Sequence, residues 1–292
     1  HRWMEEFCST VPVRRAGVAL VPITHDVELA VTEIESLADK PGIRGVMVPT
    51  MWHGFPSYGS DHYDRVWAAC AEVGLVVHTH SGEADFDSYG DNVAMYVSEV
   101  PFWTHRILWQ LLFSGKFARF PGIKYAVVEC GSFWVGDLLW KSDVNFGGSS
   151  KIKKMGTRMR GLVSKLPSEY FGTSVFIGAS TMSLEEIRRR HVNGIDALMW
   201  GTDYPHPEGS WPKTVERLEN DFREVSIEAT RRLLGLNAVE CYGHDYGGLT
   251  KVAERVGPTP DDLNQDPNLR TPHDATRVAR WWLDEYGCEL KY

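Results

Sequence analysis

An apolar run that ends in an acidic residue gives this chain its clearest chemical signal. Residues 197–201 are apolar and are followed by Asp203 and then by His206, which lies between two prolines. The run is too short for a helix, and the glycine and prolines that follow predict a strand running into a loop. At such a strand end, Asp203 can act as a metal ligand or as a base. The alternative is an aspartate that only caps a turn.

Two histidines end a second apolar run. His78 and His80 alternate within residues 75–80, so in a strand both side chains point to one face, with His80 at the mouth of the sheet and His78 one layer deeper. Two neutral imidazoles on one face suit an ion such as Zn, Mn or Fe. The alternative, which concerns His78 above all, is a core histidine satisfied by hydrogen bonds.

A third run, residues 124–129, ends in Glu129. This carboxylate can bind a metal, act as a general base or orient a histidine. A carboxylate so close to an apolar strand is costly unless it is paired, so we expect a partner for it. Cys130 is interpreted as a small core residue rather than a nucleophile, because no activating base precedes it.

His78 and three further residues are candidates for substrate contact. His105 and Arg106 follow an aromatic loop at the start of an expected helix, where an arginine can bind a substrate carboxylate through two hydrogen bonds. The alternative for both is an exposed helix start. His53 lies in an aromatic loop after the second expected strand and is predicted to form part of the substrate pocket wall.

Apolar runs alternate with helical patterns along the chain, which predicts βα units and a parallel sheet. Six strands are expected, two fewer than a closed eight-stranded barrel needs. They lie at residues 17–22, 45–49, 75–80, 124–129, 174–178 and 197–201. The helices are expected at residues 27–39, 63–73, 104–114, 134–141, 184–191, 212–225 and 228–236, with a turn at Asn237.

Composition restricts the partners. The 292 residues include 31 basic and 39 acidic side chains, a net charge of -8, so nothing attracts nucleic acid or an anionic membrane. No apolar stretch reaches the roughly 18 residues that span a bilayer. Five scattered cysteines indicate neither a disulfide framework nor a thiolate zinc site, which fits a reducing, cytoplasmic location. A small-molecule substrate is therefore expected.

Four motifs, at residues 80–82, 129–134, 167–170 and 200–207, resemble the amidohydrolase superfamily. The resemblance is to its amidohydrolase-related branch, also called the aminocarboxymuconate-semialdehyde decarboxylase-like group. It implies a distorted (β/α)8 TIM barrel, an α/β fold, that binds one divalent metal ion (Zn, Mn or Fe). The barrel is expected over residues 1–257, and residues 258–292 are expected to form a helical tail packed on its outside.

The resemblance also implies which residues bind the ion. His80 matches the family's ligand on strand 5 and Asp203 the ligand on strand 8, whereas the pair of ligands on strand 1 has no counterpart in this chain. The visible strands then correspond to strands 3 to 8, which agrees with a helical pattern that starts without a cap at His1. An unpaired barrel edge predicts aggregation or pairing with another chain, for example as a homodimer.

The implied activity is hydrolysis of a small cyclic or carbonyl-containing substrate, with Asp203 taking a proton from metal-activated water and Glu129 assisting as a base. His206 is expected to orient the acid or contact the substrate. The first alternative is non-oxidative decarboxylation of a hydroxylated aromatic or muconate-like acid. Decarboxylases of the group carry a histidine where this chain has Glu129, which places a direct transfer of their mechanism in doubt. The second alternative, if the chain is complete, is a metal-free binding or scaffold protein.

Overall fold

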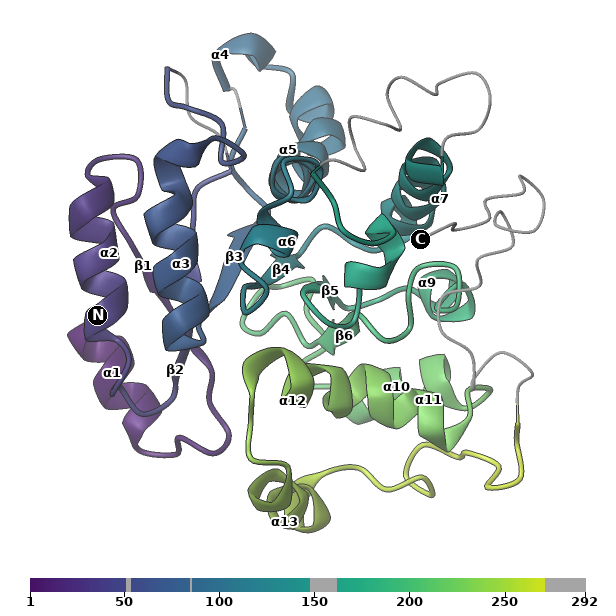
Figure 1. The fold of residues 1–292 in the computed structure, drawn as a ribbon. Helices are drawn as coiled ribbons and strands as arrows, with labels where there is room; N and C mark the ends of the chain where they lie inside the picture. The colour runs from purple at the N-terminus through teal and green to yellow at the C-terminus, as the bar shows by residue number, and fades with distance from the viewer. Residues whose placement is uncertain (51–53, 85, 148–161, 271–292) are drawn as a thin grey trace.

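The fold is built around one parallel sheet whose six strands follow in sequence order (Figure 1). The structure is a computed structural model and describes residues 1–50, 54–84, 86–147 and 162–270. The strands are β1 (Gly17–Leu20), β2 (Ile43–Met47), β3 (Val76–His80), β4 (Lys124–Val128), β5 (Val175–Ser180) and β6 (Leu198–Gly201). All six predicted strands are confirmed. The fifth continues to Ser180, two residues further than its apolar pattern indicated.

Helices connect successive strands, as expected for βα units. In the described residues they are α1 (Arg2–Ser9), α2 (Val27–Ser36), α3 (Asp64–Val73), α4 (Phe86–Tyr89), α5 (Val93–Phe113), α6 (Lys116–Arg119), α7 (Phe133–Gly147), α9 (Leu184–Arg188), α10 (Thr214–Phe222), α11 (Ile227–Arg231), α12 (Asn237–Tyr242) and α13 (Tyr246–Val256). Short turns of other helix types are η1 (Asp61–Tyr63), η2 (Pro167–Tyr170) and the π-helical η3 (Arg232–Leu236).

Two elements differ from the prediction for identifiable reasons. Helix α5 begins at Val93, where the Asn92 side chain accepts a hydrogen bond from the backbone of Met95, and it continues through Pro101. A proline normally ends a helical pattern, so the sequence placed the start of this helix eleven residues too late. The expected turn at Asn237 is instead the start of α12. The side-chain amide of Asn237 donates to the backbone oxygens of Ile195 and Leu198, each at 2.7 Å.

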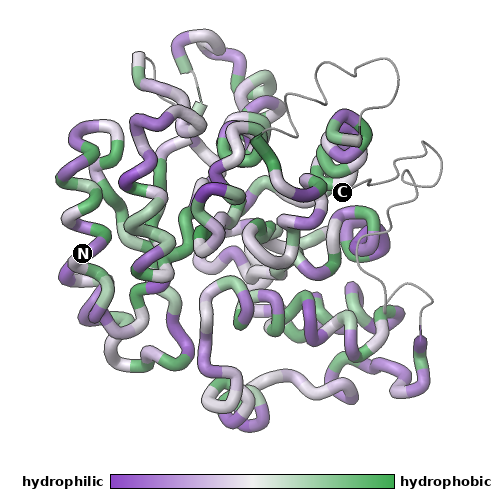
Figure 2. Tube along the Cα trace, viewed as in Figure 1, coloured by the Kyte–Doolittle hydropathy of each residue, from purple (hydrophilic) through white to green (hydrophobic). Residues whose placement is uncertain are grey.

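The two faces of the sheet carry different cores. The face that includes Val77, Val127 and Ile177 packs against the helices as one large cluster. Alternate residues of the same strands form a smaller cluster on the other, inner face, and Cys241 of α12 joins it. The strand residues of this cluster are Val76, Ala126, Phe176 and Met199. Hydrophobic and hydrophilic residues alternate along the helices, as expected for helices that turn one side to the core (Figure 2).

The sheet remains open among the described residues, because β1 pairs only with β2 and β6 only with β5. Leu20 shares the inner face with Met47 and His78 through the strand register, yet 71% of it is exposed. Six sequential parallel strands with helical connections confirm the predicted α/β fold built from βα units.

The chain after residue 257 lies against the last helices in its described part. Gln265 is buried, and its side-chain amide donates to the backbone oxygens of Phe222 and Val225 and to the hydroxyl of Thr230. Residues 258–270 contain turns and no helix, and the rest of the expected helical tail lies outside the described residues. The proposed boundary at residue 257 stays a prediction.

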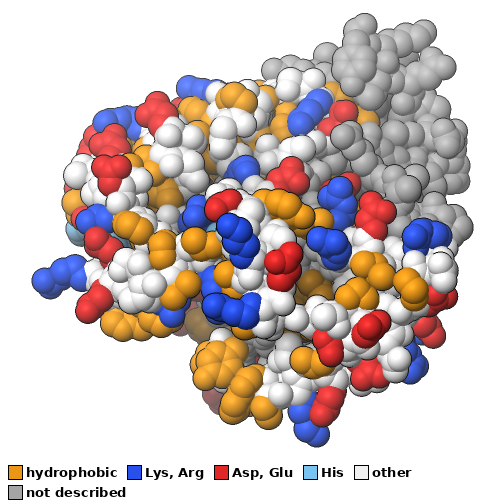
Figure 3. Space-filling model, turned by 90° about the horizontal axis from the view of Figure 1, so that it is seen from below, with side chains coloured by type: hydrophobic (Ala, Val, Ile, Leu, Met, Phe, Trp, Pro, Cys, Tyr) orange, Lys and Arg blue, Asp and Glu red, His pale blue; other side chains and the backbone are white. Residues whose placement is uncertain are grey.

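The surface mixes charges of both signs. Seen from below, basic, acidic and hydrophobic side chains are interspersed (Figure 3). Among the helices that the structure describes, none is both long enough and apolar enough to cross a bilayer.

Candidate active site

Three neighbouring strands end in residues with left-handed backbone conformation. Glu129 follows β4 with φ 57°, Thr181 follows β5 with φ 45°, and Asp203 follows β6 two residues after Gly201 with φ 58°. Residues other than glycine rarely adopt such angles. Each strained residue costs of order 1–3 kcal/mol and keeps its conformation only because the surrounding structure enforces it. Strain of this kind gathers at functional sites, so the carboxyl end of β4 to β6 is the first place to look for chemistry.

His80 and Glu129 meet at this rim. The Nε2 atom of His80 lies 2.5 Å from Oε2 of Glu129, and the Nδ1 atom lies 2.6 Å from the backbone oxygen of Ser81. A carbonyl oxygen only accepts, so Nδ1 donates to Ser81, and Nε2 is left facing the Glu129 carboxylate. The Glu129 carboxylate thus has the partner that its position at an apolar strand end requires.

Asp203 and His206 approach from the neighbouring strand. Asp203 is largely buried, and its Oδ2 lies 3.6 Å from Nδ1 of His206, which is also 4.0 Å from Oε1 of Glu129. Ligand atoms of Glu129, Asp203 and His206 all lie within 4.8 Å of one another, close enough to hold one ion together. The structure thus brings the three predicted catalytic residues together, with His80 in contact with Glu129. Their roles stay predictions.

A residue that the sequence did not single out also faces this cluster. The Glu208 carboxylate lies 3.3 Å from Nδ1 of His206, and this hydrogen bond, followed by the charge of Asp203, raises the pKa of His206 above its usual range. The loop that carries both is closed by a hydrogen bond from the Ser210 amide to the Thr202 oxygen, 2.9 Å long. A His-x-Glu spacing beside a strand end was the only available sequence signal.

His78 lies one layer below the rim, on the inner face. Its Nε2 atom lies 3.0 Å from the hydroxyl of Tyr242 and its Nδ1 atom 3.3 Å from the oxygen of Val46, and the His78 and Tyr242 rings stack. Burial lowers the pKa of His78 to about 4, so the ring is neutral. This placement favours the alternative of a satisfied core histidine, and a substrate contact stays a prediction.

The predicted substrate residues of α5 occupy two environments. His105 is buried and stacks on Trp134, with ring centroids 4.3 Å apart. Arg106 is exposed, and its guanidinium lies 5.4 Å from the centre of the Trp103 ring. His53 lies outside the described residues. Substrate binding by all three stays a prediction, although the aromatic packing of His105 fits a structural role.

His105 gives a testable link between pH and stability. Burial lowers its pKa to about 4, below the 6.5 of an unfolded histidine, so between these values only the unfolded state takes up the proton. Stability from this site is present above pH 6.5 and is lost as the pH falls towards 4. We expect His105→Phe to reduce the acid-induced loss of unfolding free energy between pH 7 and 4.5 by about 2 kcal/mol.

Urea unfolding of the parent and of His105→Phe at both pH values measures this difference. Replacing the exposed His62 by Phe makes the same chemical change outside the core and provides the control. Equal slopes for the parent and His105→Phe would show that His105 takes up its proton in the folded state.

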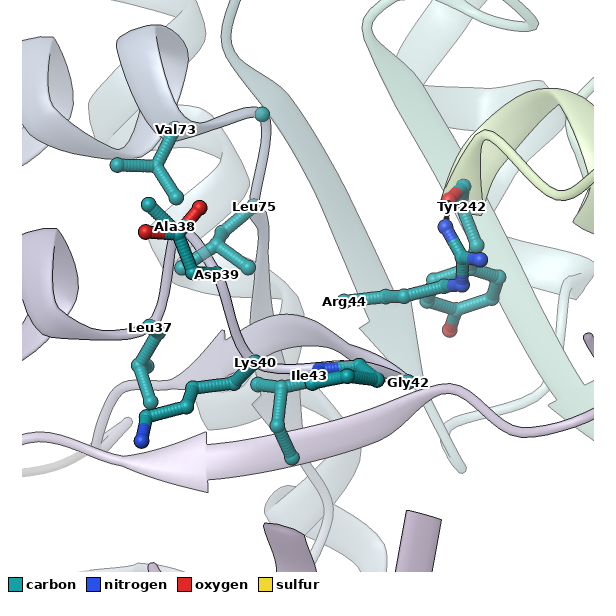
Figure 4. Close-up of a pocket in the computed structure, with 12 residues that line it drawn as sticks. Leu37, Ala38, Asp39, Lys40, Gly42, Ile43, Arg44, Val73, Leu75 and Tyr242 are labelled. Atoms are coloured by element: carbon teal, nitrogen blue, oxygen red, sulfur yellow. Dashed lines mark hydrogen bonds between the residues drawn. The ribbon is translucent and has the colours of Figure 1, made fainter. Parts of the chain in front are cut away.

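A separate hollow of about 370 Å³ lies at the opposite, amino end of β2 and β3 (Figure 4). Lys40, Arg44 and Tyr242 are among the residues that line it. The Arg44 guanidinium is engaged by the backbone oxygens of Tyr242 and Gly243, each at 3.2 Å. None of the rim residues Glu129, Asp203 and His206 lines this hollow, so the rim and not the hollow is the candidate active site.

The chain resembles known proteins in sequence and in fold. A family model described as Amidohydrolase matches residues 1–244. No curated protein sequence matches the chain. Among solved structures, 5-carboxyvanillate decarboxylase from Sphingomonas paucimobilis is 21% identical with a TM-score of 0.66, and the match covers 84% of this chain and 71% of that one.

Two further decarboxylases have similar folds. The 2,6-dihydroxybenzoate decarboxylase from Rhizobium is 15% identical with a TM-score of 0.64, covering 83% of this chain and 75% of that one. The 5-carboxyvanillate decarboxylase from Novosphingobium aromaticivorans, complexed with manganese and 4-hydroxy-3-methoxy-5-nitrobenzoic acid, is 19% identical with a TM-score of 0.68, covering 83% and 68%. At these identities the likeness shows the fold.

Proposed function

The chain belongs to the amidohydrolase family, and on that premise we propose that it is a metal-dependent decarboxylase of a small hydroxylated aromatic acid. The observation that carries this proposal is the cluster of Glu129, Asp203 and His206, whose ligand atoms lie within 4.8 Å of one another, with His80 in contact with Glu129. Membership of a family of metal-dependent enzymes argues against the metal-free scaffold.

The comparisons shift the balance between the two expected activities. Hydrolysis was the leading expectation and decarboxylation its alternative, but the structural neighbours named above are decarboxylases of aromatic acids. Hydrolysis remains the second candidate because of Glu129. Decarboxylases of the group carry a histidine at this strand end, and the branch with a glutamate there is mostly known as predicted metal-dependent hydrolases.

The residues present fit a divalent ion. His80 offers Nε2 with its proton fixed on the other nitrogen, and the carboxylates of Glu129 and Asp203 supply hard oxygen donors. Manganese, which is bound in two of the neighbours, accepts such a mixed set. We propose that His80 and Asp203 hold the ion and that Glu129 lies beside it. When bound, the ion supplies the positive charge that polarises oxygen atoms of the substrate.

The chain's own residues then move the proton. Decarboxylation transfers a proton to the ring carbon that carries the carboxylate; the carbon–carbon bond breaks, its electron pair returns to the ring, and carbon dioxide leaves. Asp203 has two oxygens, so one can contact the ion while the other holds this proton. His206, which is half exposed, can restore the proton from solvent. We assign to Glu129 the role of accepting a hydrogen bond from a ring hydroxyl.

Metal removal and an assay of both reactions test this proposal. We expect the purified chain to release carbon dioxide from 2,6-dihydroxybenzoate or 5-carboxyvanillate, the compounds after which the neighbouring decarboxylases are named. Treatment with a chelator should reduce this release to background, and added Mn²⁺ should restore it. Chromatography detects the decarboxylated arene, and a parallel panel of lactones, cyclic amides and esters detects hydrolysis. Metal-dependent turnover of that panel alone would replace the decarboxylase by the hydrolase.

A further inference from the structure

Glu186 is a buried carboxylate that connects the loops after β4 and β5. It lies on the short helix α9, and only 7% of it is exposed. Its Oε1 accepts hydrogen bonds from the backbone amide and the hydroxyl of Ser132, at 2.6 and 3.0 Å. Its Oε2 accepts from the amide and the hydroxyl of Ser183, at 2.9 and 3.0 Å.

The bonds to Ser183 are the ordinary capping box of a helix N-terminus, but those to Ser132 have a different consequence. Ser132 is fully buried and follows Glu129 by three residues. Between them the chain makes a tight turn, with φ 57° at Glu129 and φ 60° at Gly131. A group that holds Ser132 therefore determines where the Glu129 carboxylate lies.

Further contacts also hold this turn in place. The indole of Trp134 donates to the backbone oxygens of Cys130 and Gly131, at 3.2 and 3.1 Å. A Cβ atom on Gly131 would lie 3.2 Å from Oε1 of Glu186, so the turn packs directly on this carboxylate. The side-chain amide of Asn193 donates to the Ser132 hydroxyl at 3.2 Å.

We propose that Glu186 is a positioning residue that holds Glu129 at the metal site and thereby sets the affinity for the divalent ion. This inference rests on the proposed function. Glu186 contacts neither the ion nor the substrate; it acts through Ser132 and the turn that precedes it.

The amide of a glutamine separates this role from helix capping. Glutamine serves as well as glutamate in a capping box, so Glu186→Gln can keep its oxygen on Ser183. Its NH₂ group would then face the backbone N–H of Ser132, and two donors cannot bond to each other. The substitution therefore breaks the hydrogen bond from the Ser132 backbone amide while it leaves α9 capped.

Mn²⁺ titration by calorimetry on the full chain tests the proposal. We expect Glu186→Gln to weaken Mn²⁺ binding by about 10- to 100-fold, because a displaced Glu129 would no longer orient His80, the proposed ligand that it contacts, and loss of such an orienting group usually has this effect. Ser183→Ala is the matched control, since it weakens the α9 cap without touching Ser132. We expect that control to lower the melting temperature and to keep Mn²⁺ affinity within about twofold of the parent.

If Glu186→Gln cannot be purified, Glu186→Asp gives the same test. It keeps the charge but is one methylene shorter, so it cannot bond to both Ser183 and Ser132, and the same loss is expected. Mn²⁺ affinity within twofold of the parent in a folded Glu186 variant would overturn the positioning role alone. A parent that binds no Mn²⁺ would overturn the proposed function and this inference with it.

Discussion

Asp203→Asn is expected to lower kcat for decarboxylation by about 100- to 10,000-fold, the usual contribution of a positioned proton donor. Asparagine has the same shape and tolerates the left-handed backbone that Asp203 adopts with φ 58°. The substitution therefore removes the charge and the acidic proton without disturbing the turn. Mn²⁺ binding should weaken as well, because a neutral amide is a poorer ligand for a divalent ion than a carboxylate.

Carbon dioxide release, Mn²⁺ calorimetry and thermal unfolding distinguish these effects. Asp245→Asn makes the same chemical change at the N-cap of α13, outside the rim, and should leave both kcat and Mn²⁺ affinity unchanged. His80→Ala should weaken Mn²⁺ binding as Asp203→Asn does, since both residues are assigned to the ion. Unchanged Mn²⁺ binding in both rim variants would refute the assignment of the site.

The strand ends were predictable because strands carry a strong local signal. Buried parallel strands appear as short apolar runs, and the glycine, proline or acidic residue after each run marks its carboxyl end. Parallel strands place those ends on one edge, so Glu129 and Asp203, which lie far apart in the sequence, could be expected to meet there. The alternation of β3 likewise placed His80 at the rim and His78 below it.

Contacts that depend on loop geometry could not be predicted in the same way. Glu208 contacts His206 only because the loop after β6 closes on itself. Glu186 contacts Ser132 only because helix α9 lies beside the loop that follows β4. Tyr242 reaches His78 from a helix more than 160 residues away in the sequence. No periodic pattern records such pairings, since they follow from tertiary packing and not from local propensity.

The backbone of the rim suggests that function, and not stability, determines its residues. Thr181 shares the left-handed conformation of Glu129 on the neighbouring strand, and a β-branched residue is especially unfavourable there. Glycine would adopt the same angles without strain. A strained carboxylate residue at such a position therefore indicates that its side chain has a functional role, which glycine could not fill.

Replacing Glu129 by glycine should therefore change stability and function in opposite directions. We expect Glu129→Gly to raise the free energy of unfolding by about 1 kcal/mol, because it relieves the left-handed strain and removes a negative charge beside Asp203. The same substitution should abolish decarboxylation and weaken Mn²⁺ binding, because His80 loses the carboxylate that faces its Nε2 atom. Urea unfolding, the carbon dioxide assay and Mn²⁺ calorimetry measure the three quantities.

Thr181→Gly is the matched control for this experiment, since it relieves strain of the same kind on the neighbouring strand. It should stabilise the chain to a similar degree while Mn²⁺ affinity stays within about twofold of the parent. If Thr181→Gly stabilises but Glu129→Gly destabilises, the contact of Glu129 with His80 outweighs the strain, and Glu129 supports the fold as well as the site. If both variants keep full activity, Glu129 has no part in the chemistry, and its assigned hydrogen bond to a ring hydroxyl is refuted.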